Sequence, residues 1–276
     1  MAETVIRLDD KGSFNLERTL LCGQAFRWTP AGEGFCGIAG SRRLWVRQQG
    51  ATLTLRCAGA DVAFWRHYLA LDEDYDAIWR DLALRDRDLA GLGALGIRIL
   101  RQEPFEALIS FIISANNHIP RIRGIVERIC ALAGRALPEG GFAFPEPDAL
   151  AAVGEERLRE LGAGYRARYI AQTAARVAEG ALVGLRQAPL GLARERLMEL
   201  PGVGGKVADC VLLYGLHRLE AFPVDTWMRR ALGGGAPERL TAQARERLGP
   251  YAGVAQQALF WIARGERKKM QKAIDI

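Results

Sequence analysis

One stretch, residues 200–230, constrains the fold of this chain more than any other: LPGVGGKVADCVLLYGLHRLEAFPVDTWMRR. An apolar-periodic segment runs up to Pro201, and the apolar pattern resumes after Gly205. This spacing predicts a helix, a tight glycine turn and a second helix, a hairpin over about residues 190–217. The three glycines permit positive φ and bring bare main chain close to a ligand, so the turn and the helix start form a natural phosphate site. A purely structural hairpin is the alternative.

Lys206 is expected in the first turn of the second helix, where the helix macrodipole disfavours a positive charge. A nucleophilic role explains this position, because lysine attacks carbon as the neutral amine, which an electropositive or dry site favours. Cys210 follows four residues later on the same face and should flank any pocket that the amine enters. A small core residue is the alternative interpretation for Cys210.

Asp225 closes the segment Pro-Val-Asp and precedes a further helix. An Asp at such a place is often a simple N-cap. Amide donors and the helix dipole would also keep the carboxylate anionic and fix its direction, and a fixed anion stabilises a developing sugar oxocarbenium ion. A glycine hairpin, its lysine and this cap together form a specific constellation.

LPGVGGKVADC followed by PVD resembles the signature of the helix-hairpin-helix GPD superfamily of DNA glycosylases, and within it the 8-oxoguanine DNA glycosylase/lyases. The resemblance implies that Lys206 is the nucleophile and Asp225 the catalytic carboxylate. It implies hairpin contacts to the DNA backbone from Gly202, Val203, Gly204 and Gly205. It implies no required cofactor, and by analogy alone a monovalent or divalent cation at the main chain of Met198, Leu200 and Val203.

Residues 1–95 differ from the rest of the chain and predict a small antiparallel sheet. Short β-like runs separated by glycine-rich turns lie at Thr4–Leu8, Phe35–Ile38, Arg43–Gln48 and Thr52–Cys57. From Val62 onward the pattern becomes helical. We therefore expect an α+β fold, with an N-terminal antiparallel-sheet (TBP-like) domain over 1–95 and a mainly helical domain over 96–276.

The string LCGQAFRW, which includes Gly23, would by itself be an ordinary turn into a strand, but it matches the family motif GQxFRW. 8-Oxoguanine differs from guanine by a proton on N7 and an oxygen on C8, so recognition of that proton requires an acceptor. By resemblance the main-chain carbonyl of Gly23 supplies it. The resemblance also places Gln256 at the Watson–Crick edge of the lesion, with Phe260 and Cys210 against its two faces.

The helical part begins with a helix from Pro104 that is apolar nearly all round and should be buried. It ends in SANNH, where an Asn is usually a cap, and Pro120 restarts a helix. The segment resembles the family string SSNNNxxRI, in which the first asparagine and the arginine contact the cytosine left behind by the flipped lesion. Asn116 and Arg121 inherit these roles, whereas His118 departs from the usual Asn and is assigned none.

The string LGAGYRARY, residues 161–169, joins another glycine turn to a helix; an aromatic staple with a solvated basic face is its structural interpretation. By resemblance Tyr165 wedges into the base stack and Arg166 contacts the orphaned cytosine. Two positions depart from the animal members. Trp227 stands where they have His, and Ala263 replaces the Asp that would pair with that His, so one phosphate contact of the family is not assigned here.

A net charge of +6 and a pI of about 9.3 suit a polyanionic partner. The sequence has no signal-like N-terminus and no membrane-length apolar run, which favours a cytoplasmic, nucleoid-associated protein, and abundant Ala, Arg, Leu and Gly suggest a bacterial source. Five cysteines without a CxxC pair argue against a disulfide framework. No cysteine after Cys210 could hold the iron–sulfur cluster typical of endonuclease III relatives.

These features predict a monomeric DNA glycosylase/AP lyase that excises 8-oxoguanine from double-stranded DNA, preferentially opposite cytosine, by base flipping, a Lys206 Schiff base and β-elimination. Two alternatives stay open. A glycosylase for alkylated bases would be expected to lack the lysine or the cytosine contacts. A non-catalytic helix-hairpin-helix binding module has no use for Lys206 or Asp225, and it would not be trapped covalently on DNA.

Overall fold

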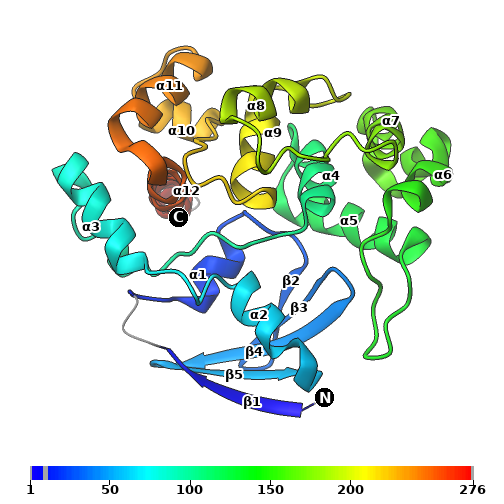
Figure 1. Ribbon diagram of the computed structural model, residues 1–276, viewed down its shortest axis with the longest axis horizontal. Coiled ribbons are helices and arrows are strands. Elements are labelled where there is room, and N and C mark those ends of the chain that lie inside the picture. Colours follow the sequence, from blue (N-terminus) through cyan, green and yellow to red (C-terminus); the bar gives the residue numbers. More distant parts are fainter. Residues whose placement is uncertain (1, 9–11, 275–276) are drawn as a thin grey trace.

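The computed structural model describes residues 2–8 and 12–274, and it stacks a helical part on a sheet part (Figure 1). The strands are β1 Ala2–Arg7, β2 Trp28–Ala31, β3 Gly34–Ala39, β4 Arg42–Gln49 and β5 Thr52–Cys57. The helices are α1 Leu16–Leu21, α2 Val62–Tyr68, α3 Tyr75–Arg85, α4 Pro104–Ser114, α5 Ile119–Ala133, α6 Pro147–Leu158, α7 Arg166–Ala178, α8 Leu190–Met198, α9 Gly205–Cys210, α10 Thr226–Ala231, α11 Pro237–Leu248 and α12 Ala252–Ile274.

The five strands form one antiparallel sheet in the order β1-β5-β4-β3-β2, which confirms the expected α+β architecture. Four strands match the predicted runs to within two residues, and β2 is the one that the sequence pattern missed. Pro30 lies in β2 and lacks an N–H, which makes the run look unlike a strand. The proline is tolerated because β2 is at the edge of the sheet.

Helices α1 and α2 cover one face of the sheet and close the N-terminal core. Trp28 is fully buried there, stacks edge-on against Trp65 and donates from Nε1 to the Tyr68 hydroxyl at 3.1 Å. Gly37 faces Trp28 across the β2–β3 pair, and any Cβ at this position would lie 2.4 Å from the indole. The sheet therefore needs a glycine at residue 37 to seat its largest core side chain.

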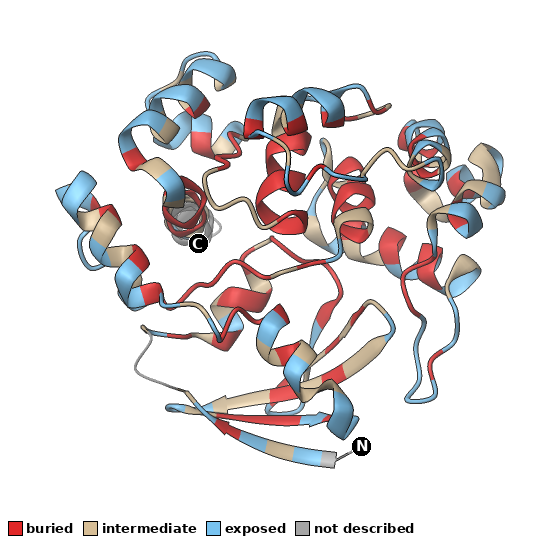
Figure 2. Ribbon diagram, in the orientation of Figure 1, coloured by how far each residue is buried: buried red, intermediate tan, exposed pale blue. Residues whose placement is uncertain are grey.

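Helix α4 lies at the centre of the helical part and packs against α5, α7 and α9. Every residue from Glu106 to Ile113 is buried, so this stretch of the helix is coloured as buried in Figure 2. This confirms the prediction of a buried helix that starts at Pro104. The boundary proposed after residue 95 stays a prediction.

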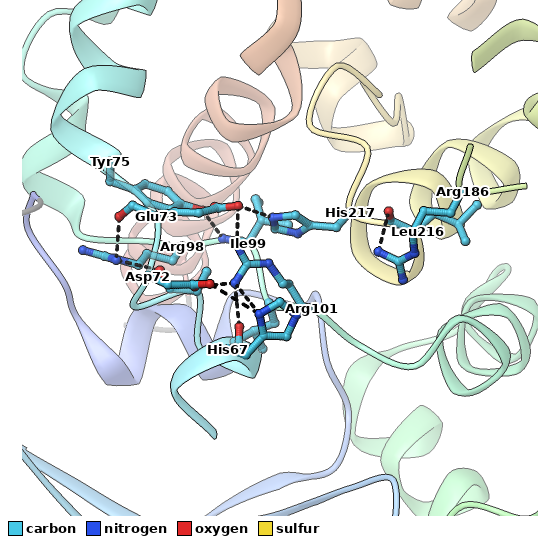
Figure 3. A network of polar contacts seen from close by, with 12 residues as sticks. His67, Asp72, Glu73, Tyr75, Arg98, Ile99, Arg101, Arg186, Leu216 and His217 are labelled. Carbon is cyan, nitrogen blue, oxygen red and sulfur yellow. Dashed lines mark hydrogen bonds and ion pairs between the residues drawn. The ribbon is translucent and has the colours of Figure 1, made fainter. Parts of the chain in front are cut away.

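A polar network ties the N-terminal part to the chain that follows the hairpin (Figure 3). Arg101 donates to Glu73 Oε1 at 2.6 Å, and His217 Nε2 lies 2.7 Å from the same oxygen. Arg101 also pairs with Asp72 and donates to the main-chain carbonyl of His67. These contacts fix how the two parts of the molecule sit against each other, and both parts contribute to the site described next.

Candidate active site

The hairpin is built by α8, a glycine turn and α9, which confirms the predicted helix-turn-helix. Gly202 has a φ of +79°, and a Cβ there would lie 2.7 Å from the Cβ of Tyr169, so the turn requires glycine. Thr173 Oγ1 on α7 donates to the Pro201 carbonyl at 2.8 Å. The turn is thereby anchored to α7, and Lys206 stands in the first turn of α9, as expected.

Lys206 points at the C-terminal end of α4. Its Nζ lies 3.2 Å from Ser114 Oγ and 5.1 Å from the centroid of the Phe111 ring. Ser114 Oγ in turn donates to the Phe111 carbonyl at 2.7 Å, which leaves an oxygen lone pair for the lysine. The amine is therefore held at one end of a buried helix instead of extending into solvent.

Asp225 is the N-cap of α10, as its sequence position predicted. One carboxylate oxygen, Oδ1, accepts from the main-chain N–H groups of Trp227 and Met228, both at 2.9 Å. The two amide donors fix the direction of this carboxylate. The second carboxylate oxygen remains available to the cavity that Asp225 lines.

Gly23 is fixed in place by its buried neighbour Gln24, which explains the polar residue of the LCGQAFRW string. The Gln24 amide donates to the carbonyls of Thr19 and Arg98, both at 2.8 Å, and its oxygen accepts from Leu100 N at 2.9 Å. Gln257 Nε2 on α12 donates to the Cys22 carbonyl at 3.4 Å. Gly23, with a φ of +93°, therefore presents its main chain to the site from a rigid segment.

These elements surround one cavity of about 370 Å³, large enough for a purine base. Its lining residues are Gly23, Phe26, Phe111, Ser114, Asn117, His118, Ile119, Pro120, Ile122, Lys206, Asp225, Trp227, Phe260 and Arg264. The sequence suggested Lys206 and Asp225 as the catalytic pair, and both line this cavity together with Gly23 and Phe260. The four residues come from four separate segments of the chain.

Cys210 and Gln256 are buried beside this cavity and do not line it. Burial raises the pKa of the Cys210 thiol to about 12, and the nearby Lys206 charge only partly opposes this, so Cys210 is a neutral thiol. Gln256 Nε2 donates to the Pro223 carbonyl at 3.1 Å, and Tyr214 donates to its oxygen at 3.4 Å. Contact of either residue with a base stays a prediction.

The three residues expected to contact the orphaned cytosine and the expected wedge, Tyr165, gather next to the cavity, around the α4–α5 turn. Asn116 occupies the left-handed region with a φ of +50°, and its carbonyl accepts from Arg166 at 3.0 Å. Arg166 is buried and also donates from Nε to the Ala115 carbonyl at 2.9 Å. Tyr165 is exposed, as a wedge would be, and Arg121 reaches the Gly162 carbonyl at 3.4 Å.

Ser114, His118, Trp227 and Arg264 are among the cavity residues to which the sequence analysis gave no role in the site. Ser114 is 92 positions from Lys206, so no local pattern could pair them. His118 is the N-cap of α5. Arg264 follows Phe260 by one helical turn, and the same spacing argument that paired Gln256 with Phe260 could have found it.

In the part of the chain that the structure describes, no group of three or more His, Cys, Asp or Glu side chains could hold a metal ion, and no helix is long and apolar enough to cross a membrane. All five cysteines are free. The cation suggested at Met198, Leu200 and Val203 stays a prediction.

Comparison with known proteins agrees with this geometry. Residues 6–108 match the family described as 8-oxoguanine DNA glycosylase, N-terminal domain, and residues 109–234 match the HhH-GPD superfamily base excision DNA repair protein. The chain is 35% identical over 277 residues to the N-glycosylase/DNA lyase OGG1 of Arabidopsis thaliana, covering 89% of this chain and 76% of the relative. It is 33% identical over 259 residues to the N-glycosylase/DNA lyase of Saccharomyces cerevisiae, covering 80% of this chain and 68% of that relative.

Among solved structures, Clostridium acetobutylicum 8-oxoguanine glycosylase/lyase, in complex with dsDNA containing cytosine opposite to 8-oxoG, superposes with a TM-score of 0.87. The sequence identity is 35%, and the match covers 93% of each chain. The protein therefore belongs to the 8-oxoguanine DNA glycosylase family of the HhH-GPD superfamily, and it is an N-glycosylase/DNA lyase.

Proposed function

We propose that this enzyme uses Lys206 as its nucleophile and Asp225 as the carboxylate that stabilises the sugar. The observation that carries the proposal is the cavity of about 370 Å³ that both residues line together with Gly23 and Phe260. A flipped purine fits a cavity of this size, and Gly23 and Phe260 supply a main-chain carbonyl and an aromatic face to hold it.

The chemistry follows from the two groups. As the bond between the base and C1′ breaks, positive charge develops on the sugar, and the oriented Asp225 carboxylate stabilises it. The neutral Lys206 amine forms a bond to C1′, and opening of the sugar ring gives a Schiff base. Loss of a C2′ proton then expels the 3′ phosphate by β-elimination, which cuts the strand.

The proposal includes a preference for cytosine opposite the lesion. Asn116, Arg121, Tyr165 and Arg166 lie together beside the cavity, where the vacated stack would be. Arg166 donates to main-chain carbonyls in the free protein, so it holds the α4–α5 turn and would contact cytosine from that anchored position. The substrate is accordingly a duplex with 8-oxoguanine paired to cytosine, bound by a monomer.

Borohydride trapping tests the lysine mechanism. The sequence has five lysines, at 11, 206, 268, 269 and 272, so a trapped adduct can be located by peptide mapping. Wild type and Lys11→Gln should form a covalent adduct with an 8-oxoguanine duplex, and Lys206→Gln should form none. Adduct formation by Lys206→Gln at the wild-type level would refute the assignment.

The same assay tests the opposite base. Duplexes with 8-oxoguanine paired to each of the four bases should trap most strongly with cytosine, and Arg121→Gln should reduce that preference. Equal trapping with all four bases by wild type would remove the cytosine assignment while leaving the lysine mechanism intact.

A further inference from the structure

The cavity contains a cation that the mechanism above does not use, Arg264 on α12. Gln256, Phe260 and Arg264 follow one another at intervals of four residues, so they lie on one face of the helix. Gln256 is buried at the deep end of this face, whereas Phe260 and Arg264 line the cavity itself. The lesion-facing stripe of α12 therefore extends one turn beyond the pair that the sequence suggested.

Arg264 lies directly against Gly23. A Cβ built on Gly23 would be 3.2 Å from Arg264 Nη1 and 3.6 Å from the Phe260 ring. Because Gly23 lacks that atom, the guanidinium can approach the segment that is proposed to accept the N7 proton of the base. The guanidinium carbon is 5.9 Å from the Phe260 ring centroid, so Gly23, Phe260 and Arg264 form one corner of the cavity.

The guanidinium is not satisfied in the free protein. Nη1 is buried and has no hydrogen-bond partner among the residues that the structure describes. A buried donor without an acceptor is costly, so a ligand that brings an oxygen to this corner would gain from binding there. Burial lowers the pKa of Arg264, and the nearby Cys22 and Asp225 groups oppose this, yet an arginine stays charged at working pH.

We propose that Arg264 is a lesion-recognition residue whose guanidinium donates a hydrogen bond to the C8 oxygen of the flipped 8-oxoguanine. This rests on the proposed function, in which the base is held with its N7 proton toward the Gly23 carbonyl. N7 is bonded to C8, which carries the oxygen, so a donor packed against Gly23 lies close to that oxygen. Guanine has no oxygen there. The cation also stabilises the negative charge that spreads over the departing base.

Two substrates distinguish base recognition from phosphate binding, because a guanidinium also pairs well with phosphate. A duplex with 8-oxoguanine opposite cytosine and one with a preformed abasic site opposite cytosine share the same phosphates, but only the first has the C8 oxygen. Both reactions require Lys206. Single-turnover base excision on the first and strand cleavage on the second are measured for wild type, Arg264→Gln, Arg264→Met and Arg264→Lys.

We expect Arg264→Gln and Arg264→Met to slow excision of 8-oxoguanine by about 10- to 100-fold, the effect of one hydrogen bond from a charged group. Cleavage at the abasic site should change by less than about twofold, and Arg264→Lys should recover part of the excision rate because its ammonium can still donate. Arg56→Gln, which removes a guanidinium paired with Glu3 on the sheet, is the matched charge control and should behave as wild type.

An equal loss on both substrates would overturn the proposal in favour of a phosphate contact, and unchanged excision would show that Arg264 has no part in recognition. Thermal melting of each variant excludes a folding defect, and Arg264→Lys keeps the test valid if the uncharged variants are unstable. Failure here is distinct from failure of the Lys206 mechanism, because wild type and Lys206→Gln report on that mechanism with the same two duplexes.

Discussion

Asp225 has a structural role as an N-cap, and we propose a chemical role for the same side chain. As an N-cap it satisfies two main-chain donors at the start of α10, and as a cavity residue it keeps an anion beside the Lys206 amine. The cap is what makes the anion useful, because the two hydrogen bonds fix the direction in which the charge points. A change that removes the charge and keeps the cap separates the two roles.

Asp225→Asn is that change, because Asn caps helices about as well as Asp. We expect a stability loss below about 1 kcal/mol, from the lost charge at the helix N-terminus. Excision of 8-oxoguanine should fall by about 100-fold or more, since the developing positive sugar loses its counter-charge. Thermal melting and single-turnover kinetics measure the two effects. An excision rate near that of wild type would show that Asp225 acts as a cap only.

The two hairpin helices are joined by an ion pair whose carboxylate, Asp209, is buried, and Asp209 lies on the same helix as Lys206. Arg194 on α8 donates from Nε to Asp209 Oδ1 at 2.9 Å and from Nη2 to Oδ2 at 3.3 Å. Asp209 is 3% exposed, so burial raises its pKa while the bond from Arg194 opposes the rise. Removing the arginine alone would leave a buried, unpaired carboxylate on the helix that carries Lys206.

Arg194→Met should therefore cost about 3–5 kcal/mol of unfolding free energy, whereas Arg194→Met combined with Asp209→Leu should recover a large part of it. Urea denaturation of the two single variants and the double variant measures the coupling. A double variant no more stable than Arg194→Met would show that the loss comes from packing of the arginine stem and not from the buried, unpaired Asp209 carboxylate.

The elements that the sequence predicted best are those in which the signal is local. Glycines within a few positions indicate the hairpin, and a run of apolar residues indicates the buried helix from Pro104. A single capping residue, Asp225, indicates the start of α10. Strand β2 was missed because Pro30 contradicts strand propensity, and only the edge position in the sheet makes it acceptable. The contact of Lys206 with Ser114 was missed because tertiary packing alone joins α9 to α4.

At the scale of the whole molecule, the site depends on the placement of the sheet part against the helical part. Gly23 belongs to the first and Lys206 to the second, and the Glu73 carboxylate bridges them through Arg101 and His217. Burial raises the pKa of Glu73, but the hydrogen bond and charge of His217, followed by Arg101, outweigh it and hold that pKa below the ordinary value of 4.5. The ionised carboxylate therefore stabilises the folded state.

Glu73→Gln should lower the free energy of unfolding by about 1–3 kcal/mol near pH 7, because the amide oxygen that replaces the carboxylate accepts without a negative charge. A depressed folded pKa contributes stability above the unfolded value, and this contribution is lost as pH falls through the folded pKa. The difference between wild type and Glu73→Gln should thus shrink below about pH 4.5. Denaturant unfolding at pH 7 and pH 4 measures it. A constant difference would exclude the ionic contribution.

Glu106 on α4 lowers the stability of the folded state when it is ionised, whereas the ionised Glu73 raises it. It is 9% exposed, its Oε2 has no hydrogen-bond partner among the described residues, and burial raises its pKa from 4.5 to about 7 even though Arg27 opposes the rise. Arg27 is bonded to Glu127 at 3.0 Å and to the Phe142 carbonyl at 2.6 Å, and its Nη1 has no hydrogen-bond partner among the described residues, so it acts on Glu106 through its charge. Folding therefore favours the protonated form of Glu106.

Because the pKa of Glu106 is higher in the folded protein than in the unfolded chain, the unfolded chain releases this proton first as pH rises. Glu106 therefore does not lower the free energy of unfolding below about pH 4.5. Its cost grows to about 3 kcal/mol as pH rises to about 7 and stays constant above that. Glu106→Gln keeps the shape without the charge, and it should match wild type near pH 4.5 and be up to about 3 kcal/mol more stable at pH 8. Urea unfolding at both pH values measures this. Glu127→Gln, which changes the exposed partner of Arg27, is the control and should keep most of the wild-type fall in unfolding free energy between pH 4.5 and pH 8. A fall of the same size in Glu106→Gln would show that another group causes it.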